Sequence, residues 1–280
     1  MGGKIKFKRA WPWIISAALS LALLFGLLFW LTLPSVSWLK KENPKETAMM
    51  GMRSAHAKQK GQRARRLWKR VPLSRISPYL IQAVLIAEDD KFFEHEGFDW
   101  ESMRKALDAN IKKKRILRGG STITQQLAKN LFLSSEQSLW RKLREAAIAW
   151  KLESELSKKR ILELYLNVID WGTGVYGAEA ASRAYFYCPA SALTLSQAIR
   201  LASILPNPHR FSALGTDSAR MNRKRRIIAA RMLRRRWIQK ETYDEAMVEM
   251  GLAPAPAVII PDTDPSTIPP APSASDQTRP

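Results

Sequence analysis

The chain has 280 residues, of which 46 are Lys or Arg and 25 are Asp or Glu, so its formal net charge is +21. A chain of this length can bury one sizeable hydrophobic core. So large a positive charge indicates a polyanionic partner, whether nucleic acid, anionic lipid or a phosphorylated substrate. A single cysteine, Cys188, excludes an internal disulfide, and the scattered His56, His95 and His209 lack the spacing of metal ligands.

An uncharged apolar run lies near the start of the chain. No charged residue occurs from Ala10 to Leu39, and the stretch 11–33 is long enough to cross a bilayer, which requires about 20 residues. Three tryptophans fall near the expected membrane interfaces: Trp11, Trp13 and Trp30. A cleaved signal peptide is the alternative, but this run is too long for one, and only 35–37 resembles a cleavage site. We therefore expect an uncleaved transmembrane helix.

The basic residues on either side of this helix do not decide its orientation. Four precede the helix, and four follow it within the window that the positive-inside rule counts: Lys4, Lys6, Lys8 and Arg9, then Lys40, Lys41, Lys45 and Arg53. Charge alone therefore leaves open the side of the membrane on which the rest of the chain lies.

A basic segment without acidic residues follows, between Met49 and Arg70, with eight Lys or Arg. It has little apolar periodicity before Leu67 and Trp68, which is typical of a solvated linker. It could also be a polybasic strip that rests on anionic headgroups, each charge contributing on the order of 1 kcal/mol near the surface. The two interpretations are compatible.

From Ser77 onward the hydrophobic period is helical, and no run alternates as a strand would. Asp99 is the expected N-cap of the second helix, and Pro206 is expected to end the seventh. The predicted helices are Pro78–Asp90, Trp100–Lys114, Ile123–Phe132, Ser138–Leu156, Lys158–Ile169, Ala178–Tyr187, Leu195–Leu205, Ser218–Trp237 and Lys240–Met250. The sequence therefore predicts an all-α fold.

The stretch Ile86–Trp100 places carboxylates between apolar and aromatic side chains. It begins at the end of an apolar helical run, and at helical spacing Glu88 shares a face with Ile81, Val84 and Phe92. Removal from water raises the pKa of a carboxyl group. Glu88 is therefore a candidate general acid or base.

A second stretch, 118–130, combines a glycine pair with a predicted helix start, where Thr122 and Gln125 have capping-box spacing. A helix start presents free backbone N–H groups and hydroxyls to an anion. Because Arg118 and Lys129 flank this one, the pattern predicts a phosphate-containing ligand.

In this order, the two stretches resemble the peptidoglycan glycosyltransferase family (glycosyltransferase family 51). Its other motifs follow, in the form Arg141-Lys142-Leu143-Arg144-Glu145 and in the segments 160–167, 172–177 and 201–208. The similarity covers 78–211, and no transpeptidase region follows, so the chain resembles the monofunctional biosynthetic transglycosylases. The resemblance implies a lysozyme-like helical domain with a long sugar cleft and a membrane-facing hydrophobic portion.

The resemblance also implies a reaction, the polymerisation of lipid-linked disaccharide-pentapeptide (lipid II) into β-1,4 glycan with inversion at C1 and release of undecaprenyl diphosphate. Such a reaction needs a base for the attacking hydroxyl and positive charge for the departing diphosphate. Glu88 matches the catalytic glutamate of the family, here given the role of base, and Glu145 matches its second cleft glutamate. Lys129 is the candidate for stabilising the leaving group.

The same resemblance assigns further residues to substrate binding: Asp89, Arg118, Ser121, Thr122, Gln125, Gln126, Asn130, Arg141 and Lys142. Without it, plainer interpretations hold: Glu88 could be a helix-end carboxylate beside Lys91, Glu145 could pair with Arg141 four residues earlier, and Lys129 could be a solvated helix lysine. One departure stands out, because Gln137 occupies a position where family members often carry an arginine. Arg118, Arg141 or Lys142 could compensate for that change, or the enzyme could be slower.

The expected organisation has a basic cytoplasmic N-terminus (1–10), a transmembrane anchor (11–33), a basic juxtamembrane linker (34–72), the glycosyltransferase domain (73–252) and a disordered tail rich in Pro and Ser (253–280). The resemblance places the domain in the periplasm of a bacterium, anchored in the inner membrane. It implies lipid II and the growing glycan chain as partners, beside the anionic membrane surface, and leaves cell-wall synthesis or division proteins open. No carboxylate cluster compels a metal, so no cofactor is expected to be required, and magnesium or manganese stays open.

Two alternatives remain at this point. A lysozyme or lytic transglycosylase would also use an acid in an all-α cleft, but its substrate is neutral at the scissile bond and gives the flanking Arg118 and Lys129 no purpose. A membrane-tethered scaffold or nucleic-acid-binding protein would use the charge of +21 without catalysis.

Overall fold

The computed structural model describes residues 7–61, 63–113, 120–134, 136, 138–172, 174–215 and 218–252. Arg118, Gln137 and the tail 253–280 therefore lie outside the described residues. Over the described ranges the protein consists of helices and one pair of two-residue strands, which confirms the all-α prediction.

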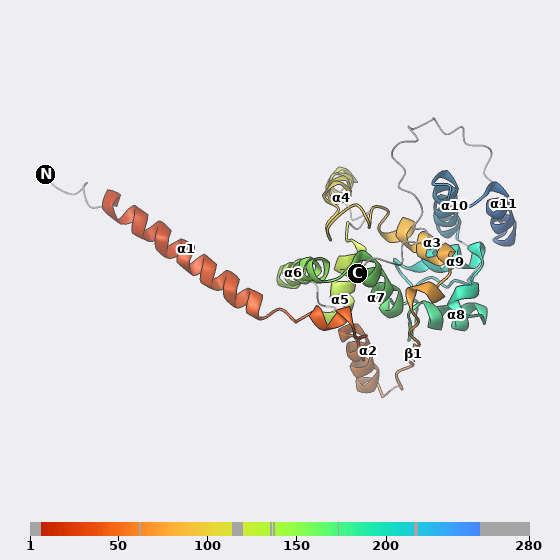
Figure 1. Cartoon of the computed structure of the whole chain (residues 1–280), viewed down its shortest axis with the longest axis horizontal. Coiled ribbons are helices and arrows are strands. Elements are labelled where there is room, and N and C mark those ends of the chain that lie inside the picture. The colour runs from red at the N-terminus through yellow and green to blue at the C-terminus, as the bar shows by residue number, and fades with distance from the viewer. Residues whose placement is uncertain are drawn as a thin grey trace.

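The elements are named in chain order (Figure 1). The α-helices are α1 (Phe7–Leu31), α2 (Ala48–Gln59), α3 (Pro78–Glu88), α4 (Trp100–Lys113), α5 (Ile123–Phe132), α6 (Leu139–Glu155), α7 (Lys158–Val168), α8 (Ala178–Phe186), α9 (Leu195–Ile204), α10 (Ala219–Arg234) and α11 (Lys240–Glu249). The 3-10 turns are η1 (Ser37–Lys40), η2 (Leu73–Arg75) and η3 (Ala190–Ala192), and the strands are β1 (Leu67–Trp68) and β2 (Val175–Tyr176).

Two groups of helices form the body of the molecule. Helix α3 packs mainly against α9 and α10, and α11 packs against α9 and α10 as well. Helix α5 packs mainly against α6 and α7. Figure 1 shows the two groups side by side, with α1 extending away from the body. The site described below lies where the end of α3 meets α5.

Each helix predicted from the sequence is present, with small differences at the ends. The largest difference is at α10, which ends at Arg234 rather than Trp237, because Arg236 adopts a left-handed backbone (φ 56°) that no α-helix continues through. The predicted N-cap of α4 is confirmed, since the Asp99 carboxylate accepts a hydrogen bond from the Ser102 N–H (2.8 Å).

The segment that follows α1, at the start of the predicted juxtamembrane linker (34–72), is packed against the body. Val36 and Leu39 are completely buried. Three basic side chains donate to its carbonyl oxygens: Arg144 Nη2 to Thr32 (3.2 Å), Lys151 Nζ to Pro34 (2.9 Å) and Arg160 Nε to Leu39 (2.8 Å). Helix α2, also not predicted, is capped by Thr47, whose hydroxyl accepts from the Met50 N–H (3.1 Å), and packs against α5. The basic segment is therefore bound to the body.

The strand pair fixes the end of this segment. Leu67 pairs in parallel with Val175, and the Trp68 indole N–H donates to the Asn167 carbonyl (2.6 Å). Gly174, in the turn before β2, has φ +73°, and a Cβ there would lie 2.2 Å from the Arg65 carbonyl oxygen. This close approach requires glycine.

Gly174→Ala is therefore expected to destabilise the domain. A left-handed backbone costs an alanine about 1–2 kcal/mol, and the contact with the Arg65 backbone should add roughly 1–3 kcal/mol. Gly61→Ala is the matched control, because Gly61 has a similar φ of +66° but nothing within 4 Å of the added Cβ. Urea unfolding followed by tryptophan fluorescence measures both; equal losses of stability would show that the close approach contributes nothing.

Candidate active site

Helix α3 delivers a carboxylate to the interior of the domain. It begins with Pro78 at its first turn, where a proline is tolerated, and Leu80, Ala83 and Val84 are completely buried against neighbouring helices. Glu88 is its last residue. The fit of this apolar helix between α9 and α10 therefore determines where Glu88 lies.

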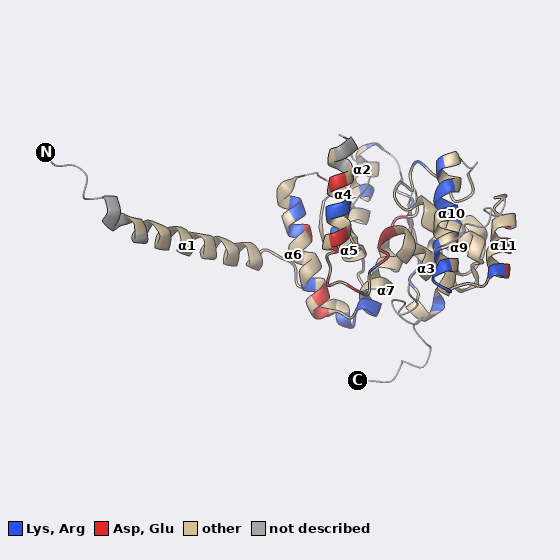
Figure 2. Ribbon diagram, turned by 90° about the horizontal axis from the view of Figure 1, so that it is seen from above, with Lys and Arg blue, Asp and Glu red and all other residues tan. Residues whose placement is uncertain are grey.

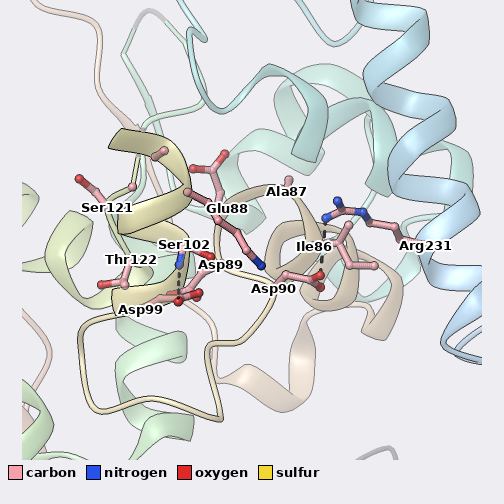
Figure 3. Close-up of a pocket in the computed structure, with 13 residues that line it drawn as sticks. Ile86, Ala87, Glu88, Asp89, Asp90, Asp99, Ser102, Ser121, Thr122 and Arg231 are labelled. Carbon is pink, nitrogen blue, oxygen red and sulfur yellow. Dashed lines mark hydrogen bonds and ion pairs between the residues drawn. The ribbon is translucent and has the colours of Figure 1, made fainter. Parts of the chain in front are cut away.

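Glu88 lines a pocket of about 190 Å³ formed by the end of α3, by α4, by residues 120–122 and by Arg231 of α10. Figure 3 shows its carboxylate pointing away from that of Asp99. The residue is partly exposed, but its Oε1 atom is shielded from solvent and has no hydrogen-bond partner among the described residues. Burial raises the pKa of the Glu88 carboxyl group, against the opposing effects of the Lys224 charge and a hydrogen bond from Gln126. The predicted desolvation of Glu88 is confirmed.

A hydrogen-bonded chain orients this carboxylate. Glu88 Oε2 accepts from Gln126 Nε2 (3.0 Å), and Gln126 Oε1 accepts from the Tyr165 hydroxyl (3.1 Å). Tyr165 is completely buried, and burial raises the pKa of its hydroxyl well above the usual value, so it remains a donor. Gln126, predicted to bind substrate, thus has an orienting contact with Glu88.

Asp89 is used within the fold. One carboxylate oxygen accepts from the Ile123 N–H at the start of α5 (2.9 Å), and the other lies 2.9 Å from His95 Nε2. Asp89 is 6% exposed. It ties the end of α3 to the first turn of α5 and places a negative charge at that helix N-terminus, which is a favourable position for one.

The capping box predicted at the start of α5 is confirmed, but the free N–H groups are not. Gln125 N–H donates to Thr122 Oγ1 (3.2 Å), Thr122 N–H donates to Gln125 Oε1 (3.0 Å), and the Thr122 hydroxyl donates to the Gly97 carbonyl (2.7 Å). Because Asp89 takes the Ile123 N–H, the N–H groups of Thr122, Ile123 and Gln125 are all occupied within the fold and are not offered to a phosphate. Thr122 and Gln125 are both 2% exposed and hold α5 in place.

Basic side chains of α6 surround the second glutamate. Glu145 is 3% exposed; its Oε2 accepts from Arg141 Nη1 (2.6 Å), and its Oε1 pairs with Lys142. Lys142 Nζ also donates to Ser121 Oγ (3.2 Å). The pair between Glu145 and Arg141, which sequence reasoning left as an alternative to a site role, is present. Because the Glu145 carboxylate is buried and contacts both Arg141 and Lys142, it holds these two cations next to each other.

The negative charges of both Glu88 and Glu145 act on the ammonium group of Lys129 on α5. Burial lowers the pKa of its ammonium group, Glu145 and Glu88 raise it, and Arg141 and Lys142 lower it. Within the part of the chain that the structure describes, its Nζ forms no ion pair and no hydrogen bond, and it is not among the atoms shielded from solvent. Lys129 is therefore a cation available to a ligand, near a desolvated carboxylate.

The structure thus brings together most of the predicted site. Glu88, Lys129, Glu145, Arg141, Lys142 and Ser121 lie around the meeting point of α3, α5 and α6. Asn130 is half-buried on α5, beside Lys129. Arg118 lies outside the described residues. No group of three or more His, Cys, Asp or Glu that could hold a metal occurs in the described ranges, and the prediction that no cofactor is required stays a prediction.

Sequence reasoning missed several charged residues around Glu88: Arg231, Lys105, Asp90 and Asp99 line its pocket, and Lys224 acts on it from α10. Lys224 of α10 is the cation that acts most strongly on Glu88. It lies in the run 223–226, in which every residue is Lys or Arg, a run typical of a solvated surface. The available signal was its helical spacing, because Lys224 shares a face with Met221 and Ile228, both of which are buried.

The chain is similar in sequence to proteins of known family. Residues 54–233 match the Transglycosylase family model. The biosynthetic peptidoglycan transglycosylase of Nitrosospira multiformis is 46% identical over 226 residues, which cover 81% of this chain and 96% of that protein. The protein of the same name from Dechloromonas aromatica is 51% identical over 190 residues, covering 68% and 82%. Penicillin-binding protein 1A from Haemophilus influenzae, a solved structure, is 23% identical with a TM-score of 0.35, over 66% of this chain and 18% of that one.

Proposed function

The chain belongs to the transglycosylase family, and on that basis we propose that it polymerises lipid II into β-1,4 glycan strands, with inversion at C1 and release of undecaprenyl diphosphate. Its general activity, that of a transglycosylase acting on peptidoglycan precursors, follows from its relatives. The expected lysozyme-like helical fold is confirmed with the family.

The observation that supports the proposal is a desolvated carboxylate beside an unpaired cation. Glu88 accepts the proton of the sugar hydroxyl as that oxygen bonds to C1 of the growing chain. The bond from C1 to the diphosphate oxygen breaks on the opposite face, and the electron pair leaves with the diphosphate. A base whose pKa is raised above that of an ordinary glutamate is suited to this transfer.

The leaving group needs positive charge. Lys129 meets the diphosphate as a mobile point charge, because the described structure gives its ammonium group no other partner. Arg141 and Lys142 supply further charge, and Glu145 keeps them in place. Ser121 and Asn130 are assigned to the substrate beside these cations, whereas Asp89, Thr122, Gln125 and Gln126 act by positioning Glu88 and α5.

The anchor and its surroundings support a membrane location. Residues 13–31 form a helix long and apolar enough to span a bilayer. Near its end, Phe29 and Trp30 contact Trp140 and Trp150 of α6 at 5.0 and 5.5 Å between ring centroids. Tryptophan is common at the level of lipid headgroups. We place the anchor in the bacterial inner membrane and the domain, 73–252, in the periplasm, where it meets lipid II and the growing chain.

Polymerisation of lipid II by the purified full-length chain in detergent is the test. We expect polymeric glycan together with released undecaprenyl diphosphate. Cleavage of preformed strands without any polymerisation would favour the lytic alternative. Salt-dependent DNA binding with no reaction on either substrate would favour the scaffold alternative.

A further inference from the structure

Lys224 has an unusual orientation for a lysine. A lysine at a protein surface ordinarily buries its aliphatic stem and exposes its ammonium group. Lys224 does the reverse: the residue is partly exposed, whereas its Nζ is completely shielded from solvent. Helix α10 carries many other Lys and Arg side chains (Figure 2). Lys224 directs its charge into the interior, as does the neighbouring Arg225, which is completely buried.

The counterpart of this ammonium group is Glu88. Both Lys224 Nζ and Glu88 Oε1 are buried, and neither has a hydrogen-bond partner among the described residues. The two groups do not form a direct ion pair in the described structure, yet each acts on the other: Lys224 lowers the pKa of Glu88, and Glu88 raises that of Lys224. A lone buried charge is costly, so each of these charges depends on the other.

The other charged groups around Glu88 come from several elements. Lys129 of α5 lowers the pKa of Glu88 by less than Lys224 does, and the adjacent Asp89 raises it. Tyr165 of α7 is neutral and reaches Glu88 through Gln126. Arg200 is the charged residue of α9, the remaining helix packed against α3. Lys224 is thus the strongest positive charge acting on this carboxylate.

We propose that Lys224 is a positioning residue for the base, because its inward ammonium group keeps Glu88 a carboxylate between turnovers. The proposal rests on the proposed function, since it concerns the same proton transfer. Lys224 exchanges no proton in the reaction: the proton passes from the sugar hydroxyl to Glu88, and Lys224 stays positively charged throughout. Lys129, in contrast, serves the leaving group.

The test compares pH profiles of kcat/KM for lipid II polymerisation by the full-length chain, from about pH 5 to about pH 9. Lys224→Met removes the charge and keeps a long apolar stem. We expect its acid limb to move to higher pH by about one unit, which means about tenfold lower kcat/KM on the acid limb and a nearly normal rate at high pH. Lys224→Arg should retain the wild-type limb, because it keeps the charge.

Arg223→Met is the matched control, since Arg223 is the exposed neighbour on the same helix and its removal changes the net charge equally. It should leave the profile unchanged. Lys224→Gln replaces Lys224→Met if the latter fails to fold. A uniform fall of the rate at all pH values, an unmoved acid limb, or an equal shift in Arg223→Met would overturn the proposal. In each of those cases, polymerisation that still depends on Glu88 leaves the proposed function intact, whereas a wild-type chain that forms no polymer from lipid II removes it.

Discussion

Glu88→Gln is expected to lower the rate of lipid II polymerisation by about 10²- to 10⁴-fold, the contribution typical of a positioned general base. An amide has the size of the carboxyl group but cannot take the proton. The substitution preserves the local structure, because the amide oxygen can still accept from Gln126 Nε2, as Glu88 Oε2 does. Rates of glycan formation and of undecaprenyl diphosphate release measure the effect.

The charge of Glu88 also affects stability. Because burial raises the pKa of Glu88, the folded state disfavours its charge, and this penalty is present at neutral pH and declines as the pH falls through the folded pKa. Glu88→Gln removes this penalty but leaves the buried Lys224 ammonium group without its counter-charge, so the double variant Glu88→Gln/Lys224→Met, which removes both charges, should have a higher melting temperature at neutral pH than Glu88→Gln alone. Glu249→Gln, at an exposed glutamate at the end of α11, is the control for activity. Near-normal polymerisation by Glu88→Gln would remove Glu88 from the role of base.

Lys129→Met should reduce polymerisation by about 10²- to 10³-fold, the loss expected when one group that stabilises developing negative charge is removed. Lys129 has no ion-pair partner within the described structure, so the loss reports on its contact with substrate rather than on a broken salt bridge. Lys129→Arg should restore part of the rate. Lys159→Met, at an exposed lysine of α7, should have no effect. If Lys129→Met kept more than half of the wild-type rate, the diphosphate would have to be stabilised elsewhere.

The helices were predictable because their signal is local. The largely apolar run before Glu88, the Thr122–Gln125 cap and the Asp99 cap each depend on side chains a few residues apart, and all three are present as predicted. The burial of Glu88 followed from the same helical period, since a residue on the apolar face of α3 enters the core with it.

Features that depend on distant partners were not predictable. Helix α2 has little apolar periodicity and is stabilised mainly by packing, of Met50 for example, against the body. The sequence around the start of α5 predicts free N–H groups for an anion, because nothing in it shows that Asp89, 34 residues earlier, occupies the Ile123 N–H. Lys224 was missed because its partner Glu88 lies on another helix.

The pH dependence of wild-type polymerisation tests most directly whether Glu88 works as a base beside protonated Lys129. The rate should rise with pH through the pKa of Glu88, because only the carboxylate accepts a proton. This pKa should lie above that of an ordinary glutamate. At higher pH the rate should fall again as Lys129, whose pKa is lowered, loses its charge. Lys129→Arg should move this fall in rate to higher pH. A rate that instead declines as the pH rises through the lower pKa would mean that the carboxyl group acts as an acid, which would contradict glycan polymerisation by this site.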